Sequence, residues 1–212
     1  MGGQYSGDGI SFDGTDYWFD PSVAGEGTHE VLYVYTDPQT QCSNSCSFNI
    51  TVIFIPDVVC PGDMMVCIND DAFDLTGATP EGGTYAGPGV SGGFFNPSIA
   101  GVGSHTITYT VGVVGTNCFA QCEFEITVKS LPVIDCPGDM EICLYSPTIP
   151  LDNAYPQGGT YSGEGVFFET GFYYFDPSIG VGEYEITYCV TDPDTGCTNC
   201  CTYIIKVIAD HV

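Results

Sequence analysis

The chain contains three copies of one glycine-rich segment, and this repetition constrains its fold more than any other feature. Each copy reads Gly-Gly-x-Tyr-x-Gly-x-Gly followed by Ile or Val, and the copies begin at Gly2, Gly82 and Gly158. Self-similarity at a fixed period is the signature of repeat architectures, in which each unit is one small module. A chain of this kind favours an extended, multi-module protein over an enzyme with a single active site.

Each copy continues through Phe-Asx-Pro-Ser, a Gly-x-Gly turn and segments in which apolar and polar residues alternate. The alternation is clearest in 105–111, 122–128, 184–190 and 201–207. A period of two over seven residues predicts half-buried antiparallel strands. Short strands with turn signals every 8–12 residues predict an all-β, immunoglobulin-like sandwich, and no segment is expected to be helical. Tyr33, Tyr109 and Tyr188 occupy equivalent places and suggest either a tyrosine corner or an ordinary core tyrosine.

The repeats define three predicted modules. Residues 1–54 form a partial repeat that lacks its first two strands, whereas 55–129 and 130–212 are complete repeats. The linkers, residues 53–57 and 129–132, are short and each contains a proline, which stiffens the joint. We therefore expect modules stacked end to end as a rod, with neighbouring repeats as partners. The exposed sheet edge of the first module is covered either by flanking sequence or by a neighbouring chain.

The charge balance excludes two classes of partner. The chain has 27 acidic residues, two lysines, no arginine and a formal net charge of −25. Such a surface repels nucleic-acid phosphates and anionic lipid headgroups. No run of 18 apolar residues occurs, so no transmembrane helix and no direct membrane insertion are expected.

Twelve cysteines in recurring positions predict structural disulfides and therefore an extracellular, oxidising location. The cysteines expected to form bridges are Cys42, Cys46, Cys60, Cys67, Cys118, Cys122, Cys136, Cys143, Cys189, Cys197, Cys200 and Cys201.

Three connectivities stay open for the recurring cysteines. Local pairs, such as Cys60–Cys67 and Cys136–Cys143, would use every one of them and are narrowly favoured. A rival joins the first and last strands of each module, as in Cys136–Cys201, and a third option links one module to the next. Cys189 and Cys200 occur only in the last copy, and a cross-strand bridge between them is expected.

Acidic hairpin loops are candidate calcium sites, because Ca²⁺ takes six to eight oxygen ligands from carboxylates and carbonyls. The first candidates are Asp37, Asp192 and Asp194, with further clusters at 13–16 and 69–74. None matches the EF-hand spacing, and Asp, Pro and Gly are also ordinary turn formers.

No constellation predicts catalysis, and no catalytic residue or organic cofactor is expected. His29 and His105 are equivalent, but the third copy has Tyr184 there, which indicates a strand side chain and not a general base or metal ligand. The glycine-rich segment precedes no helix and carries no lysine, so it is not a phosphate loop. Aromatic residues at 17–19 and 172–175 could hold sugar rings, although core packing is favoured.

The combined motif resembles the tandem repeats of giant cell-surface adhesins of Bacteroidetes, including gliding-motility adhesins. It consists of Cys-Pro-Gly-Asp-Met-x-x-Cys, Gly-Gly-Thr-Tyr-x-Gly-x-Gly-Val, Phe-Asx-Pro-Ser, Gly-x-Gly and Ile-Thr-Tyr. The repeats are also similar, more loosely, to hyaline-repeat and PKD-type modules. The resemblance implies stalk repeats of an outer-membrane-anchored filament that is exported by type IX secretion and contacts a surface. The alternative is a calcium-dependent module that binds carbohydrate or another surface.

Overall fold

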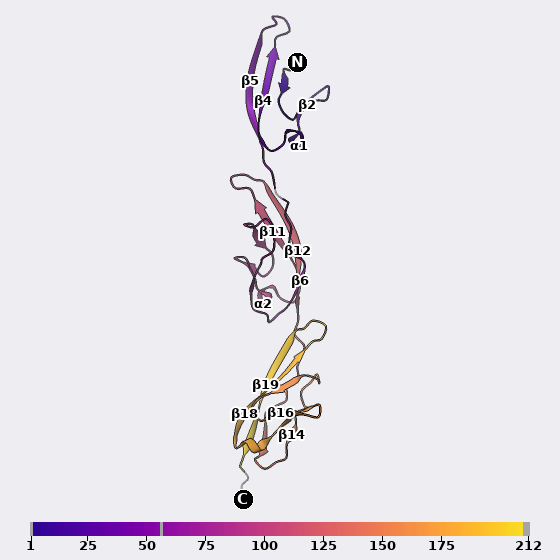
Figure 1. The fold of residues 1–212 in the computed structure, drawn as a ribbon, viewed down its shortest axis with the longest axis vertical. Helices are drawn as coiled ribbons and strands as arrows, with labels where there is room; N and C mark the ends of the chain where they lie inside the picture. The colour runs from indigo at the N-terminus through magenta and orange to yellow at the C-terminus, as the bar shows by residue number, and fades with distance from the viewer. Residues whose placement is uncertain (1, 56, 210–212) are drawn as a thin grey trace. The chain divides into compact units, whose positions relative to one another are not determined.

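The computed structural model describes residues 2–55 and 57–209, and these residues form strands joined by turns and three short helical segments (Figure 1). The prediction of an all-β, immunoglobulin-like fold is confirmed. Pro56, in the first linker, lies outside the described residues, as do Met1 at the start of the first predicted module and residues 210–212 at the end of the last. No helix in the described part of the chain is long and apolar enough to cross a membrane.

The first repeat forms two small antiparallel sheets, ordered β1-β4-β5 and β2-β3. The long hairpin of β4 and β5 is its main element, and Val31 on β4 is its best-buried side chain. The strands are β1 (Gln4–Ser6), β2 (Ile10–Phe12), β3 (Tyr17–Phe19), β4 (Gly27–Thr36) and β5 (Ser43–Val52).

The second repeat has two sheets, ordered β6-β12-β11-β8 and β7-β10-β9. Its sheets are not wholly antiparallel as predicted, because β6 pairs with β12 in parallel. The strands are β6 (Met64–Cys67), β7 (Phe73–Asp74), β8 (Thr84–Ala86), β9 (Val90–Ser91), β10 (Phe94–Phe95), β11 (Gly103–Gly112) and β12 (Phe119–Lys129).

The third repeat has the same topology, with sheets ordered β13-β19-β18-β15 and β14-β17-β16. Here too the first strand pairs in parallel with the last, β13 with β19. The strands are β13 (Met140–Cys143), β14 (Ile149–Pro150), β15 (Thr160–Ser162), β16 (Val166–Glu169), β17 (Phe172–Phe175), β18 (Gly182–Thr191) and β19 (Thr198–Ile208).

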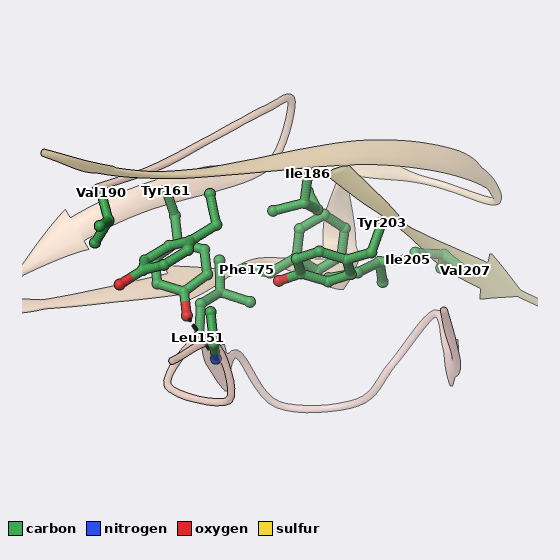
Figure 2. Close-up of a cluster of buried hydrophobic side chains, with 10 residues drawn as sticks. Leu151, Tyr161, Phe175, Ile186, Val190, Tyr203, Ile205 and Val207 are labelled. Atoms are coloured by element: carbon green, nitrogen blue, oxygen red, sulfur yellow. Dashed lines mark hydrogen bonds between the residues drawn. The ribbon is translucent and has the colours of Figure 1, made fainter. Parts of the chain in front are cut away.

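The core of the third repeat follows from the alternation in its sequence. Ile186 on β18 and Tyr203 and Ile205 on β19 point inward, and Phe175 of the second sheet packs with them (Figure 2). Tyr188 on β18 belongs to the same buried cluster. Burying one large apolar side chain contributes about 1.5–3 kcal/mol, so this cluster is a main source of stability. The equivalent cluster of the second repeat includes Phe95, Ile107 and Ile126.

The prediction that no segment is helical is wrong at the Phe-Asx-Pro-Ser motif. Each copy forms one short helical turn: α1 (Pro21–Ala24), α2 (Pro97–Ala100) and the 3₁₀ turn η1 (Pro177–Ile179). The side chain of the preceding Asp or Asn accepts the amide of the following serine, and proline occupies the first helical position. Both are standard signals of a helix start.

The described residues divide into two compact units. One contains the chain up to Val59 together with residues 79–83 and 110–122, and the other contains residues 60–78, 84–109 and the chain from Glu123 onward. The three module boundaries and the rod therefore stay predictions.

Candidate functional site: the disulfide-linked joint and its surroundings

Disulfides connect elements that are far apart in the sequence. Cys136, just before β13, bonds Cys201 of β19, with Cα atoms 6.1 Å apart. Cys60 and Cys122, the equivalent positions of the second repeat, are also disulfide-bonded. The connectivity between the first and last strands of a module, one of the open alternatives, is thus the one that holds in the third repeat.

The narrowly favoured local pairs are wrong. Cys136 pairs with Cys201 and not with Cys143, and Cys67 and Cys197 pair with each other. The physical reason is that an extended chain rises roughly 3.3 Å per residue, so cysteines seven residues apart, as Cys136 and Cys143 are, lie up to roughly 23 Å apart, and cysteines four residues apart up to roughly 13 Å. A disulfide requires Cα atoms within about 7 Å.

Two further predictions about the cysteines have different outcomes. The cross-strand bridge between Cys189 and Cys200 is present, because these residues oppose each other in the register of β18 and β19. Cys42, Cys46 and Cys118, by contrast, carry free thiols, so the prediction that all twelve cysteines form bridges is wrong for these three.

A further disulfide links two successive repeats, and we call the contact around it the joint. Cys67 ends β6, and it bonds Cys197, a residue 130 positions later that lies fully buried in the turn before β19. The Cα atoms are 5.6 Å apart, within the usual range of disulfide geometry. This connectivity was the third open alternative, and sequence spacing alone could not select it.

Side-chain amides reinforce this joint on both sides of the disulfide. The Asn69 side chain donates to the Thr198 carbonyl oxygen at 3.3 Å. The Asn199 side chain donates to the carbonyl oxygen of Pro132, in the linker, at 2.9 Å. The sequence placed Asn69 in a candidate calcium cluster and did not single out Asn199, because their hydrogen-bond partners lie 129 and 67 residues away.

The aspartates of the two Cys-Pro-Gly-Asp motifs hold the first strand against the last. The Asp63 carboxylate accepts the Glu125 amide, and the Asp139 carboxylate accepts the Ile204 amide, each at 2.8 Å. These aspartates were also missed, although their recurrence within the motif could have revealed them. The motif therefore marks a strand whose start is fixed by a carboxylate and a cysteine.

Two of the three candidate calcium ligands, Asp37 and Asp192, accept hydrogen bonds from their own hairpin loops. The Asp37 carboxylate accepts the amides of Gln39 and Thr40, and Asp192 accepts those of Asp194 and Thr195. The backbone hydrogen bonds, led by that from Gln39, lower the pKa of Asp37. Turn formation accounts for these residues.

Among residues 2–55 and 57–209, no group of three or more His, Cys, Asp or Glu side chains could hold a metal ion. Calcium binding at the hairpin loops therefore stays a prediction.

The histidines occupy a structural position. The His29 and His105 side chains donate from Nε2 to the carbonyl oxygens of Gly25 and Gly101, at 2.9 and 2.8 Å. The Tyr184 hydroxyl donates to the equivalent oxygen of Gly180 at 3.0 Å. All three satisfy the carbonyl that follows a helical turn, as expected for a strand side chain.

The Gly-Gly-x-Tyr motif forms a socket for the central tyrosine. In the third repeat the Tyr188 hydroxyl accepts the Gly159 amide at 2.9 Å and donates to the Pro156 carbonyl oxygen. The ring of Tyr161 packs on that of Tyr188, with centroids 4.5 Å apart. In the first repeat Tyr33 accepts the Gly3 amide in the same way. Of the two alternatives left open, the buried hydroxyl with a backbone partner is nearer to a tyrosine corner, but the partner is a glycine about 30 residues upstream.

One open hollow lies beside this socket, with a volume of about 410 Å³. Its lining includes Tyr161, Phe168, Phe172 and Tyr173, with Asp152 as the only acidic side chain. Phe172, in the segment 172–175 predicted to hold sugar rings or to pack in the core, is exposed, as is its neighbour in the hollow, Phe168, whereas Phe175 is fully buried. The other aromatic candidate, Trp18, is exposed and donates to Asp13 at 2.8 Å.

No protein-family model matches the chain, and comparison with curated proteins gives no match. Comparison with solved structures finds the I-band fragment I67–I69 of titin, at 14% identity and a TM-score of 0.35, covering 87% of this chain and 75% of that chain. It also finds immunoglobulin domains 1–5 of Sidekick-1, at 12% identity and a TM-score of 0.30, covering 97% and 54% of the two chains. The insect immune protein hemolin aligns at 10% identity and a TM-score of 0.30, covering 98% of this chain and 68% of that one.

Proposed function

We propose that the chain is a non-catalytic stalk segment of a secreted, filamentous adhesin on a cell surface. Its role is to carry load and to provide length, with neighbouring repeats of the same chain as its main partners. The finer features are outer-membrane anchoring, type IX export, a role in gliding and contact with a polysaccharide or solid surface. These rest on the resemblance of the repeat motifs to adhesins of Bacteroidetes.

The observation that carries the proposal is the covalent joint between Cys67 and Cys197. A disulfide between successive repeats adds nothing to a binding pocket, but it restricts bending and stretching of the chain. The amides of Asn69 and Asn199 add hydrogen bonds at the same joint. Disulfides persist in oxidising compartments, which supports an extracellular location.

Small-angle scattering of the oxidised fragment tests this function. A stiff stalk gives the pair-distance distribution of a rod, and the Cys67→Ser/Cys197→Ser variant gives a broader range of lengths. The Cys189→Ser/Cys200→Ser variant is the matched control, because it removes a bridge within one hairpin and should keep the rod. A compact particle for the unmodified fragment would contradict the stalk.

Calcium-dependent carbohydrate binding is the less favoured alternative. The exposed aromatic side chains of the hollow beside Tyr161 suit a sugar ring, but the loop carboxylates already accept loop amides. A glycan array with and without EDTA separates the two functions. Binding that EDTA abolishes would favour the alternative, and the stalk predicts none.

A further inference from the structure

The last strand of the first repeat has an open edge that the other repeats cover. β5 is the outer strand of the sheet β1-β4-β5, whereas the equivalent strands β12 and β19 each pair with a further parallel strand. In those sheets Ile126 lies beside Met64, and Ile205 lies beside Met140. The position equivalent to Ile126 and Ile205 in β5 is Ile50, so the register of a missing strand can be read directly.

The apolar face beneath this edge is exposed in the first repeat. Phe48 is 48% exposed, whereas its equivalents Phe124 and Tyr203 are 5% and 4% exposed. Ile50 is only half-buried, but Ile126 is fully buried. In the complete repeats, apolar side chains of the first strand and the residue after it pack on this core, namely Met64, Val66 and Ile68 in one and Met140, Ile142 and Leu144 in the other.

Two thiols stand where the other repeats have disulfides. Cys46 on β5 is equivalent to Cys201, which bonds the first cysteine of a Cys-Pro-Gly-Asp motif. Cys118, in the turn before β12, is equivalent to Cys197, which bonds the second cysteine of such a motif. A hydrogen-bond donor for the aspartate of the motif is also present. In the third repeat Asp139 accepts the Ile204 amide, and the equivalent amide in β5 is that of Asn49.

We propose that β5 is a binding site for a further strand of the type Cys-Pro-Gly-Asp-Met-x-x-Cys, which adds in parallel to its open edge. The strand's first cysteine bonds Cys46, its aspartate accepts the Asn49 amide, and its second cysteine bonds Cys118. The two such strands within the chain are already paired with β12 and β19, so the occupant is a third copy from outside residues 1–212. Addition of a strand to a sheet edge is an established mode of peptide recognition.

Each bond can form by exchange with a small disulfide such as oxidised glutathione. The Cys46 thiolate attacks the glutathione disulfide, giving a mixed disulfide and one reduced glutathione. The thiolate of the incoming cysteine then attacks the sulfur of Cys46 and releases the second glutathione. Two thiols are oxidised, one glutathione disulfide is reduced, and the two thiol protons end on the two glutathione molecules.

A synthetic peptide with the sequence of residues 57–69 tests the site. The intact fragment is incubated with the peptide in a glutathione redox buffer, and the products are mapped without reduction by mass spectrometry. We expect one peptide per chain, bonded to Cys46 and Cys118. Docking raises the effective concentration of the thiols, so the reaction should be at least about tenfold faster than with a scrambled peptide that keeps both cysteines.

Two protein variants and a peptide without cysteines test the separate parts of the proposal. Cys46→Ser should abolish the bond to the first peptide cysteine, whereas Cys42→Ser, which removes an exposed thiol in the neighbouring turn, should leave the reaction unchanged. A peptide with both cysteines replaced by serine should still slow amide hydrogen exchange in β5, which shows binding apart from thiol chemistry.

Some outcomes would overturn the proposal. These are no adduct, equal labelling of Cys42, Cys46 and Cys118 at the rate of the scrambled peptide, or a dimer in which a second molecule's residues 60–67 occupy β5. The stalk proposal is independent of this test, since a rod-shaped fragment that ignores the peptide would keep the stalk and reject the site.

Discussion

The Tyr188 hydroxyl accepts a hydrogen bond from the Gly159 amide at 2.9 Å, and this contact explains the most repeated motif of the chain. A Cβ atom on Gly159 would lie 2.5 Å from the Tyr188 ring and 2.4 Å from the Cys189 carbonyl oxygen. Gly3 meets Tyr33 in the same way. The second glycine of Gly-Gly-x-Tyr is therefore required by a tyrosine on a different strand.

Gly159→Ala should lower the free energy of unfolding by about 1–3 kcal/mol, because overpacking forces the tyrosine or the backbone to move. Chemical denaturation of the two proteins measures the difference. Gly138→Ala is the matched control, since a Cβ there meets no atom within 4 Å and should change stability little. Equal losses in the free energy of unfolding for the two variants would contradict the close packing of Gly159 against Tyr188.

The disulfide between Cys67 and Cys197 should prevent a pulling force from extending most of the last two repeats. Pulled from its ends, the oxidised chain transmits force through Cys67 and Cys197, so the 130 residues that separate them in sequence cannot extend. Reduction should release roughly 430–470 Å of contour length, at 3.3–3.6 Å per residue. Single-molecule force spectroscopy with and without reductant measures this gain.

Removal of the Cys189–Cys200 bond provides the comparison for the stretching experiment. Residues 189–196 lie within the loop that the Cys67–Cys197 bond already closes, so removal of the Cys189–Cys200 bond alone should release almost no contour length. If reduction of the unmodified chain releases no more than this control, the joint bond does not carry load.

The strands could be predicted from sequence because their signal is local. Alternation marked β11, β12, β18 and β19, and the repeat showed that His105 and Tyr184 share one role, which the hydrogen bonds confirm. The bridge between Cys189 and Cys200 could also be predicted, but the one between repeats could not, since Cys67 and Cys197 meet only through the packing of two repeats. The helical turns were missed although Asx-Pro-Ser carries the local signal, because three or four residues give no helical periodicity.

His105→Tyr should be nearly neutral, because Tyr184 makes the same contact with the carbonyl of Gly180. His105→Phe keeps the ring but leaves the Gly101 carbonyl without its donor, and should cost about 1 kcal/mol. Thermal and chemical denaturation of both variants measure these effects. A large loss in His105→Tyr would show that the imidazole has a role other than this hydrogen bond.

Asp176, the residue before η1, should make the stability of the third repeat fall at low pH. The second repeat has Asn96 at this position and should lack this contribution. Hydrogen bonds from the Ser178 side chain and amide lower the pKa of Asp176 below that of an ordinary aspartate. As the pH falls, the unfolded chain therefore takes up this proton before the folded protein does. The stabilisation is complete above the unfolded pKa and is lost as the pH falls through the folded pKa.

Asp176→Asn should test this directly, because the equivalent Asn96 accepts the same serine amide without titrating. The wild type should exceed the variant in stability at pH 7, where the charge-assisted bond is stronger. The difference should shrink as the pH is lowered from 4 to 2, as followed by urea denaturation at each pH. A side-chain NMR titration should give Asp176 a midpoint below 3.8. A difference that is constant over this range, or a midpoint above 3.8, would contradict the carboxylate cap.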